Sequence, residues 1–503
     1  MNLGSVLLDA GGEAPALTAG ESTIGHGALA DLVSRTAGGL AAHGVAPGER
    51  VAIVAGNTTV VVAAYLATLW SGAIAVPIDP GSGVGELGRR LAAVEPRVTV
   101  VDRAGRDSYV AAVADIDLST TVIDAGGGIE GADTWDSITT GLPVPVTDRD
   151  DADVAVLLFT AGTGGLPKPA MLTHGNLAAN ISQVLQHPGL ALRDSDVSLG
   201  SLPLFHVFGL NVVLGVTLAA GGNVVLVEEF HPAATATLIA SKGVTVVAGV
   251  PAMFEAWLDA ADVAPDTFSG VRLAVSGAAP LGAETAEAFA QQFGVVVHEG
   301  YGLTEASPIV TTAAVSDELR AGSIGPALPG VEVQLVDVDG TAVLPGDPGE
   351  IWVRGPNVFP GYWRADDATR TVLTPDGWLR TGDIAVADES GWLRIVDRAK
   401  DLVIVSGFNV YPAEVEDVLL AHPDVAEAAV VGEPDPRTGE RILAFVVPTP
   451  GHQPDPAALS AWTARQLARY KCPRHIEIVA ELPRSFVGKL LRRELRAGNT
   501  EPR

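Results

Sequence analysis

The sequence predicts an α/β protein with a large N-terminal domain, a β-rich subdomain and a small C-terminal α+β domain. Three features of the 503-residue chain carry this prediction. Apolar strand-like and helix-like runs alternate through the N-terminal half, shorter strand-like runs follow residue 325, and a further set of helix-like and strand-like runs follows residue 398. A hydrophobic content of 47% supplies enough apolar side chains for more than one core.

The N-terminal alternation is clearest between residues 48 and 80. A short apolar strand (VAIVAG) is followed by a helix-like run (TTVVVAAYLATLWSG) and a second strand (AIAVPID). This order is typical of parallel α/β structure. Further strands that end at Gly, Ser or acidic residues are expected near residues 98, 223, 244, 271 and 295. Because ligands of open α/β sheets bind outside the C-terminal ends of the strands, we expect the site there.

The β-rich subdomain and the C-terminal domain are predicted from shorter elements. VEVQLVD and GEIWVRG alternate in polarity as half-exposed strands do. Beyond Arg398, PAEVEDVLLAH is expected to be a helix, and AEAAVVGEP and RILAFVVP are expected to be strands. We therefore predict two domains, residues 1–397 and residues 398–503, with the β-rich subdomain at the end of the first.

The composition excludes several classes of protein. A net charge of −28, without a block of Lys or Arg, opposes binding to nucleic acid or to an anionic membrane. Cys472 is the only cysteine, which rules out an intrachain disulfide, a four-cysteine metal site and a CxxC motif. The N-terminal residues lack the pattern of a signal peptide, so a cytoplasmic location is expected. Polar residues interrupt the apolar stretch 202–227, and we expect a buried helix and strand there rather than a membrane span.

A loop suited to phosphates follows one apolar strand. The string VAVLLFTAGTGGLPKPAMLTHGNL contains Thr160, Thr163, Gly165 and Lys168, and a helix is expected to start near Thr173. Backbone N–H groups exposed by glycine, together with one lysine, can cradle phosphate oxygens. The loop is not a Walker motif, because a proline follows the lysine where Ser or Thr is required. By itself, such a turn is more often only a turn.

Together with AVSGAAPLG, HEGYGLTEASP, GWLRTGDIA and LPRSFVGKLLRREL, this loop resembles the signatures of the adenylate-forming enzymes. That superfamily includes acyl-CoA synthetases, coumarate ligases, luciferases and peptide-synthetase adenylation domains, and the resemblance covers most of the chain. It implies stacked, mostly parallel sheets in the N-terminal domain and a mobile C-terminal domain. The loop departs from the usual pattern at Ala161, Gly164 and Pro169. Losing two hydroxyl donors would weaken direct contacts to the β- and γ-phosphates by about 1.5 to 3 kcal/mol each.

The resemblance implies a role for each residue of the nucleotide site. Tyr301 would stack on adenine, Thr304 would bond the α-phosphate, and Glu305 would hold Mg²⁺, which needs oxygen ligands. Asp383 would accept both ribose hydroxyls, and Arg398 would add a donor on the same sugar. The other cofactor-binding residues that it implies are Gly277, Ala278 and Ala279 beside adenine, Gly300 and Gly302 around Tyr301, and Thr160, Thr163, Gly165 and Lys168 of the phosphate loop.

The string PLFHVFGLN supplies the acyl side of the expected site. A lone histidine among apolar residues is usually a core residue, but the family motif has a matching histidine beside the acyl pocket. His206 is therefore assigned a catalytic and substrate-binding role, and Phe208 and Val212 are assigned to the same pocket. Residues 201–227 contain no Asp or Glu, so the carboxylate with which amino-acid-activating relatives hold an ammonium group is missing. The acid is expected to be apolar.

The C-terminal motifs imply a two-step cycle. Lys489 would bridge the substrate carboxylate and the α-phosphate during adenylation, although without the resemblance it would be interpreted as a solvated lysine in a basic run. Lys400 would be the hinge residue, and Gly407 would lie near the pantetheine arm of the thiol. The small domain would deliver Lys489 first and then rotate to present the face of Gly407.

The sequence thus predicts an ATP-dependent carboxylate:CoA ligase, most like a fatty acyl-CoA synthetase, that forms an acyl-adenylate and releases AMP and pyrophosphate. ATP, Mg²⁺ and CoA are the expected cofactors and co-substrates, and a fatty or other apolar acid is the expected substrate. Two alternatives stay open. The acyl group could pass to the phosphopantetheine of a carrier protein, or the altered phosphate loop could mark a non-catalytic acyl- or nucleotide-binding protein. Peripheral membrane contact also stays open, although no basic or amphipathic segment requires it.

Overall fold

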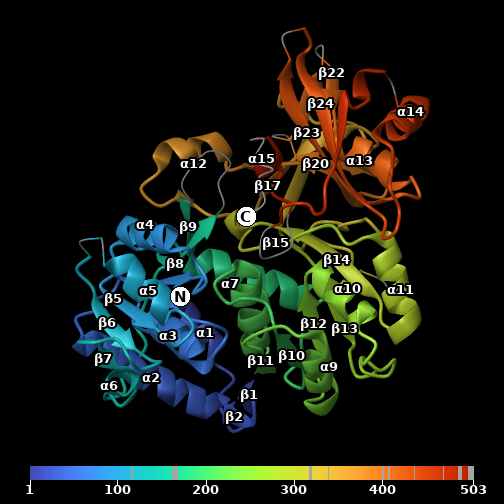
Figure 1. Cartoon of the computed structure of the whole chain (residues 1–503). Helices are drawn as coiled ribbons and strands as arrows, with labels where there is room; N and C mark the ends of the chain where they lie inside the picture. Colours follow the sequence, from blue (N-terminus) through green and yellow to red (C-terminus); the bar gives the residue numbers. More distant parts are fainter. Residues whose placement is uncertain are drawn as a thin grey trace. The chain divides into compact units, whose positions relative to one another are not determined.

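The computed structural model of the chain contains two compact units (Figure 1). The first comprises residues 1–332 and 353–379, and the second comprises residues 333–352 and 380–503. The predicted boundary between residues 397 and 398 lies inside the second unit, because the β-rich segment clusters with the C-terminal part, and this boundary stays a prediction. The structure describes residues 1–114, 116, 118–160, 168–315, 320–337, 339–398, 401–405, 408–435, 437–467, 469–484 and 490–496.

One eight-stranded sheet of the first unit has the order β18-β9-β8-β4-β3-β5-β6-β7. From β8 to β7 neighbouring strands are parallel, and β9 and β18 form an antiparallel edge. The strands are β3 (Arg50–Val54), β4 (Ile74–Ile78), β5 (Val98–Val101), β6 (Thr121–Asp124), β7 (Asp133–Thr134), β8 (Val154–Thr160), β9 (Lys168–Thr173) and β18 (Gly361–Tyr362). Helices α4 (Val84–Val94) and α5 (Arg106–Val113) complete its core through side chains such as Leu87, Leu91 and Tyr109.

The second eight-stranded sheet has the order β15-β14-β13-β12-β10-β11-β1-β2, with a parallel centre and antiparallel edge strands β15 and β2. The strands are β1 (Pro15–Ala19), β2 (Ser22–Gly25), β10 (Val197–Gly200), β11 (Asn223–Leu226), β12 (Val246–Gly249), β13 (Leu273–Ser276), β14 (Val297–Gly302) and β15 (Ile309–Thr312). Helices α9 (Pro232–Ser241), α10 (Pro251–Asp259) and α11 (Ala283–Phe293) lie beside this sheet (Figure 1). The predicted α/β class with stacked, mostly parallel sheets is confirmed.

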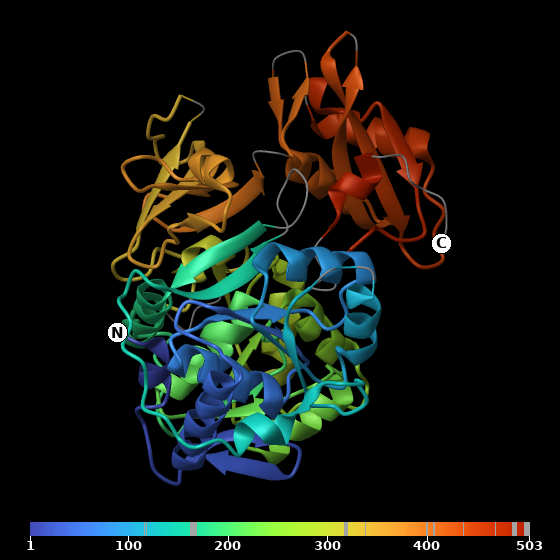
Figure 2. The same cartoon turned by 90° about the vertical axis from the view of Figure 1, so that its left-hand side faces the viewer.

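Helices of the first unit pack against its two sheets (Figure 2). Helix α3 (Thr59–Trp70) packs on β3 and β4, whereas the π-helix η1 (Phe208–Val216) packs on β10. Helix α7 (His174–Gln186) contacts both β9 and η1. Every residue of α3 from Val61 to Leu69 is buried, which explains why its sequence is apolar on all faces rather than on one stripe. The remaining helices of this unit are α1 (Leu3–Leu7), α2 (His26–Ala42), α6 (Trp135–Thr139), α8 (Thr217–Ala219), the 3₁₀ turn η2 (Thr304–Ala306) and α12 (Asp366–Val372).

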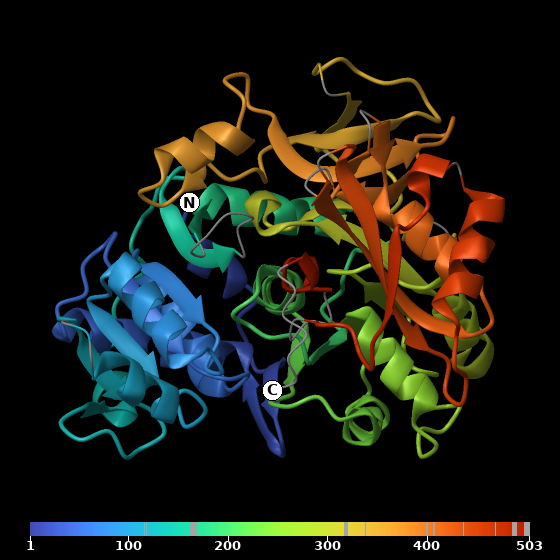
Figure 3. The same ribbon diagram turned by 45° about the horizontal axis from the view of Figure 1, so that its top comes forward.

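The second unit contains two smaller sheets. The four-stranded sheet has the order β16-β17-β19-β20, formed by β16 (Glu332–Val336), β17 (Pro348–Arg354), β19 (Leu379–Ala387) and β20 (Leu393–Arg398). The five-stranded sheet is dominated by the long hairpin of β23 (Val425–Asp435) and β24 (Gly439–Pro448), drawn in orange to red in Figure 3. Its other elements are β21 (Val403–Val405), β22 (Phe408–Val410), β25 (His475–Ile478), α13 (Pro412–Leu420), α14 (Pro456–Gln466), the 3₁₀ turn η3 (Arg469–Lys471) and α15 (Arg492–Arg496).

Among the described residues, no helix is both long and apolar enough to cross a membrane. The stretch 202–227 contains η1 and β11, as expected, but the helix has the wider π geometry.

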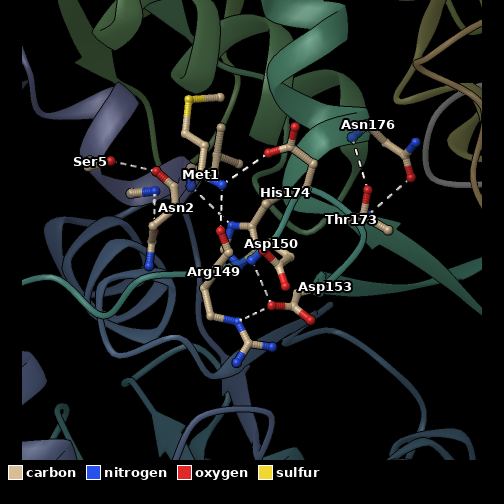
Figure 4. A network of polar contacts seen from close by, with 12 residues as sticks. Met1, Asn2, Ser5, Arg149, Asp150, Asp153, Thr173, His174 and Asn176 are labelled. Carbon is tan, nitrogen blue, oxygen red and sulfur yellow. Dashed lines mark hydrogen bonds and ion pairs between the residues drawn. The ribbon is translucent and has the colours of Figure 1, made fainter.

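Helix α7 and the N-terminal residues meet in the polar network of Figure 4. Thr173 caps α7, because its hydroxyl accepts from the Asn176 N–H at 3.0 Å and the Asn176 amide oxygen accepts from the Thr173 N–H at 3.2 Å. The predicted helix start is confirmed. The next residue, His174, is fully buried, and its Nδ1 accepts from the Leu3 N–H at 3.0 Å. Burial, reinforced by the charge of Arg149, lowers the pKa of His174 to about 4.

The free energy of unfolding should therefore fall as the pH drops from 6.5 towards 4. The unfolded histidine takes up a proton below pH 6.5 while the folded one stays neutral, and this difference costs about 3 kcal/mol near pH 4. His174→Asn keeps an acceptor near the Leu3 N–H but cannot titrate. In urea unfolding at pH 6.5 and 4.2, the variant should lose about 2 to 3 kcal/mol less than the wild type. Equal losses would contradict the burial of a neutral imidazole.

Candidate active site

Parallel strands β10, β12, β13 and β14 end at one edge of the second sheet, and the predicted adenine residues lie there. Gly277 to Ala279 follow β13, and Gly300 to Gly302 end β14. A methyl group at Gly277 would lie 3.1 Å from the Phe208 ring and 3.6 Å from the Gly300 carbonyl oxygen. The structure thus brings a predicted acyl residue against two predicted nucleotide residues.

Two strained residues occur at this edge. Ala278 (φ 69°) and Ser307 (φ 70°) are two of the four described non-glycine residues with positive φ. Such backbone costs about 1–3 kcal/mol per residue and concentrates at functional sites, where the surroundings impose it. Both lie in predicted motifs, which marks the edge as a site held in shape by the fold.

The turn after β14, residues 304–309, carries the predicted α-phosphate and metal residues Thr304 and Glu305. Three buried asparagines from different elements donate their amide groups to its backbone carbonyls. Asn357 bonds the Ala306 oxygen at 2.9 Å, Asn211 bonds the Ser307 oxygen at 2.8 Å, and Asn180 bonds the Ile309 oxygen at 2.8 Å. The Phe359 N–H bonds the Glu305 oxygen, the Ser307 N–H bonds the Thr304 oxygen, and the Leu303 N–H bonds the Pro308 oxygen. Every carbonyl from 304 to 309 is therefore bonded.

The side chain of Glu305 meets the described ends of the phosphate loop. The Tyr362 hydroxyl donates to Glu305 Oε1 at 2.7 Å. The Thr160 hydroxyl, near this phenol, donates to the Lys168 oxygen at 3.4 Å. The Lys168 ammonium lies 5.8 Å from the centre of the Tyr362 ring. These contacts follow from β18, whose Tyr362 pairs with Ala170 of β9. Thr160, Lys168 and Glu305, predicted from separate motifs, are thus brought together around Tyr362.

The acyl side is formed by the start of η1. His206 precedes the helix and is exposed to solvent, which disfavours its interpretation as a core residue. Neighbouring atoms still crowd its ring, and this partial desolvation lowers the pKa of His206, with Arg90 acting in the same direction and Asp79 opposing it. Phe208 and Val212 are half-buried on η1. π-Helical turns are rare and occur frequently at functional sites.

The predicted ribose residues lie in the second unit. Asp383 on β19 and Arg398 on β20 are direct cross-strand partners in the backbone register. Asp383 is buried, and its N–H donates to the Thr381 hydroxyl at 3.1 Å. The strand pairing therefore brings the backbones of two predicted ribose residues, from different motifs, next to each other.

Comparison with known proteins agrees with this geometry. The family model described as "AMP-binding enzyme" matches residues 8–363, and "AMP-binding enzyme C-terminal domain" matches residues 414–489. The chain belongs to the AMP-binding enzyme family. The predicted membership of the adenylate-forming superfamily is thereby confirmed.

Named relatives of this AMP-binding enzyme match between about two thirds and nearly all of its length. It is 38% identical over 490 residues to a feruloyl-CoA synthase from Amycolatopsis sp, covering 96% of this chain and 95% of the relative. It is 42% identical over 355 residues to a long-chain-fatty-acid–CoA ligase from Escherichia coli O157:H7, covering 68% of this chain and 61% of the relative. The crystal structure of ATP-bound MatB from Rhodopseudomonas palustris matches with a TM-score of 0.91 and 34% identity, covering 99% of this chain and 98% of MatB.

Some predicted residues of the AMP-binding enzyme lie outside the described residues. These are Thr163 and Gly165 of the phosphate loop, the hinge residue Lys400, Gly407 and Lys489. Their roles rest on the resemblance alone.

Sequence reasoning missed the residues that support the turn. Asn180, Asn211 and Asn357 each stand in an apolar run, HGNLAANISQ, FGLNVV and GPNVF. Because buried polar side chains are almost always hydrogen-bonded, each one was a signal of a backbone partner. Which carbonyl each would meet could not be deduced, since the partners are between 51 and 129 positions away. Tyr362 gave no signal beyond an aromatic residue in a short strand.

Asn180→Ala tests the support of the turn. Asn180 both donates to the Ile309 oxygen and accepts from the Ile309 N–H at 3.1 Å, so the variant should lose about 2 kcal/mol in the free energy of unfolding. ATP affinity, measured by isothermal titration calorimetry, should fall by about tenfold as the turn loosens. Asn223→Ala is the control, because Asn223 bonds Thr18 on the far side of the second sheet. Equal effects of the two variants on ATP affinity would reject the role of the turn.

Proposed function

We propose that this AMP-binding enzyme is an acid–CoA ligase that uses ATP to activate a fatty or other apolar carboxylic acid as its acyl-adenylate. The apolar character of η1 is the observation that supports an apolar acid. This nine-residue helix has no charged residue, and its first residue, Phe208, lies against Gly277. A charged group on the acyl part would be unpaired against this wall, which is costly. The reaction class itself, AMP-forming ligation of an acid to CoA, is the predicted one, and the family and the named relatives agree on it.

The proposed chemistry needs positioning more than acid–base catalysis. A carboxylate oxygen attacks the α-phosphorus of ATP, the bond to the β-phosphate oxygen breaks, and pyrophosphate leaves. The CoA thiol then attacks the acyl carbonyl, loses its proton, and AMP leaves. Because the first step brings anions together, fixed donors and positive charge lower its barrier. We assign Thr304 to the α-phosphate, Lys168 to the phosphate loop and Lys489 to the attacking carboxylate.

Glu305 fits the metal that this reaction needs. Its carboxylate is a hard oxygen ligand with about four lone-pair sites, one of which accepts from the Tyr362 phenol. Among the described residues, no group of three or more His, Cys, Asp or Glu side chains could hold a metal ion. Mg²⁺ is commonly bound by one or two carboxylates together with substrate phosphates, and we propose that it arrives here with ATP.

The remaining assignments follow the same resemblance. We place Tyr301, with Gly277 to Ala279, at adenine and Asp383 and Arg398 at the ribose. Lys400 is the proposed hinge of a mobile C-terminal domain that begins at residue 398, and Gly407 is placed beside the pantetheine arm. Because ATP and CoA are the co-substrates, we place the reaction in the cytoplasm.

The length of the acid is the finer part of the proposal. Medium- or long-chain fatty acids suit an apolar wall, and long-chain fatty acids are named for one relative. Arylpropenoic acids are the second candidate, because the feruloyl-CoA synthase is similar over 96% of this chain.

A panel of acids should decide the substrate. With ATP and Mg²⁺, pyrophosphate release should require an apolar acid, and AMP and acyl-CoA should appear together by mass spectrometry when CoA is added. The candidate acids are represented by octanoate, palmitate and ferulate. Phenylalanine is the negative control and should be inactive, because its ammonium group has no carboxylate partner on η1. Adenylate that persists with CoA would favour a carrier protein. ATP binding without pyrophosphate release for any acid would contradict the proposal.

Two variants separate the half-reactions. Lys489→Ala should slow adenylation at least 100-fold, since it removes the positive charge that offsets the meeting anions, while CoA thioester formation from supplied acyl-adenylate should continue. Gly407→Leu should do the reverse, because its side chain would fill the space proposed for the pantetheine arm. Lys242→Ala, which removes a lysine paired with Glu21, is the control. Parallel losses in both assays for both site variants would reject the two-conformation cycle.

A further inference from the structure

Tyr362 occupies the point where three predicted parts of the nucleotide site meet. Its side chain is 9% exposed, and its hydroxyl donates to Glu305 Oε1 at 2.7 Å. Thr160, the last residue of β8 before the phosphate loop, lies near this phenol and donates its hydroxyl to the Lys168 oxygen at 3.4 Å. The ring lies 5.8 Å from the ammonium of Lys168, the first residue of β9. One side chain therefore contacts the residue proposed for the metal and both described ends of the phosphate loop.

The backbone holds Tyr362 and Glu305 in register with each other. Tyr362 pairs with Ala170 on β9, and the Trp363 N–H bonds the Pro169 oxygen at 2.8 Å. The Phe359 N–H bonds the Glu305 oxygen at 2.9 Å, and the Phe359 and Tyr362 rings meet edge to face at 5.0 Å. Residues 359–363 thus fix both the main chain and the side chain of Glu305.

The Tyr362 phenol donates its hydrogen bond to a charged acceptor. Its hydroxyl lies 2.7 Å from Glu305 Oε1. Hydrogen bonds to charged groups are about twice as strong as neutral ones, so this contact restrains the carboxylate.

We propose that Tyr362 is a positioning residue for metal binding. It holds one oxygen of Glu305 so that the carboxylate faces the metal ion carried by the nucleotide, and it links this orientation to the phosphate loop through Thr160 and Lys168. The inference rests on the proposed role of Glu305 and goes beyond it. A ligand carboxylate that is free to rotate pays rotamer entropy on binding, whereas one fixed by an outer hydrogen bond does not.

A purely structural role would give a different result. If Tyr362 only packed residues 359–363, then Phe at this position would preserve its function, because the ring, the edge-to-face contact and the lysine contact all survive. The hydroxyl alone distinguishes the two roles. Removing an outer hydrogen bond of a metal ligand typically costs about 10- to 100-fold in metal affinity.

The test is metal affinity in Tyr362→Phe, measured without turnover. Mn²⁺ binding to the complex of the full chain with an ATP analogue whose α,β-bridge is carbon is followed by electron paramagnetic resonance. We expect the Mn²⁺ dissociation constant to rise about tenfold, while the affinity for the metal-free analogue stays within about twofold of the wild type. Tyr65→Phe is the matched control. Tyr65 is fully buried on α3, and within the described part of the chain its hydroxyl has no hydrogen-bond partner.

Glu305→Gln separates the positioning role of Tyr362 from the proposed metal-binding role of Glu305. If Glu305→Gln weakens Mn²⁺ binding and Tyr362→Phe does not, the positioning role is overturned and the role of Glu305 stands. If Glu305→Gln leaves Mn²⁺ binding unchanged, both the metal-binding role of Glu305 and the positioning role of Tyr362 are rejected. The double variant Tyr362→Phe/Glu305→Gln should bind Mn²⁺ no more weakly than Glu305→Gln alone, because the tyrosine acts through the carboxylate. Additive losses would instead indicate an independent effect of Tyr362 and overturn the inference.

Discussion

The site depends on one constraint, the complete hydrogen bonding of the turn after β14. This turn lies between β14 and the start of β15 at Ile309, so most of its carbonyls lack a regular partner in the sheet. Buried carbonyls without partners are costly. Side chains from α7, η1 and the segment before β18 supply the missing donors. An ordinary loop would face water instead. Here the bonds fix Thr304 and Glu305 from three sides, and they tie the two sheets together at the place where the chemistry is proposed.

This constraint explains why polar residues stand inside otherwise apolar elements. Asn211 interrupts η1, and Asn180 lies on the buried face of α7, where an apolar residue would pack with less desolvation cost. The desolvation cost of each asparagine is offset by a hydrogen bond to a carbonyl that would otherwise be unpaired. The wider π geometry of η1 belongs to the same arrangement, since Asn211 reaches both the Leu177 oxygen and the Ser307 oxygen. The elements that pack the core therefore also shape the site.

The sequence predicted what depends on local pattern. The strands near residues 98, 223, 244, 271 and 295 exist, the helix start near Thr173 was predicted, and the motifs led to the family. It could not predict contacts between distant segments, such as Tyr362 with Glu305, which are separated by 57 positions. His206 illustrates a further limit. Its apolar neighbours along the chain suggested burial as the default, but exposure depends on where η1 begins relative to β10, and this is set by tertiary packing.

The charge of the chain shows why such precise local support matters. At a net charge of −28, the protein as a whole repels ATP and CoA, so binding must come from a few groups placed close to the phosphates. At its proposed place Glu305 adds a further negative charge near the phosphates, which would favour binding only with a cation between the two. The attraction between the carboxylate and such a cation depends on their distance, because Coulomb attraction at short range in a partly buried site is several times stronger than in bulk water. A carboxylate displaced by rotation would repel the nucleotide instead. Under the proposed roles, the hydrogen bond from Tyr362 to Glu305 would let an acidic protein use an acidic side chain to bind ATP, because it keeps the carboxylate in one orientation.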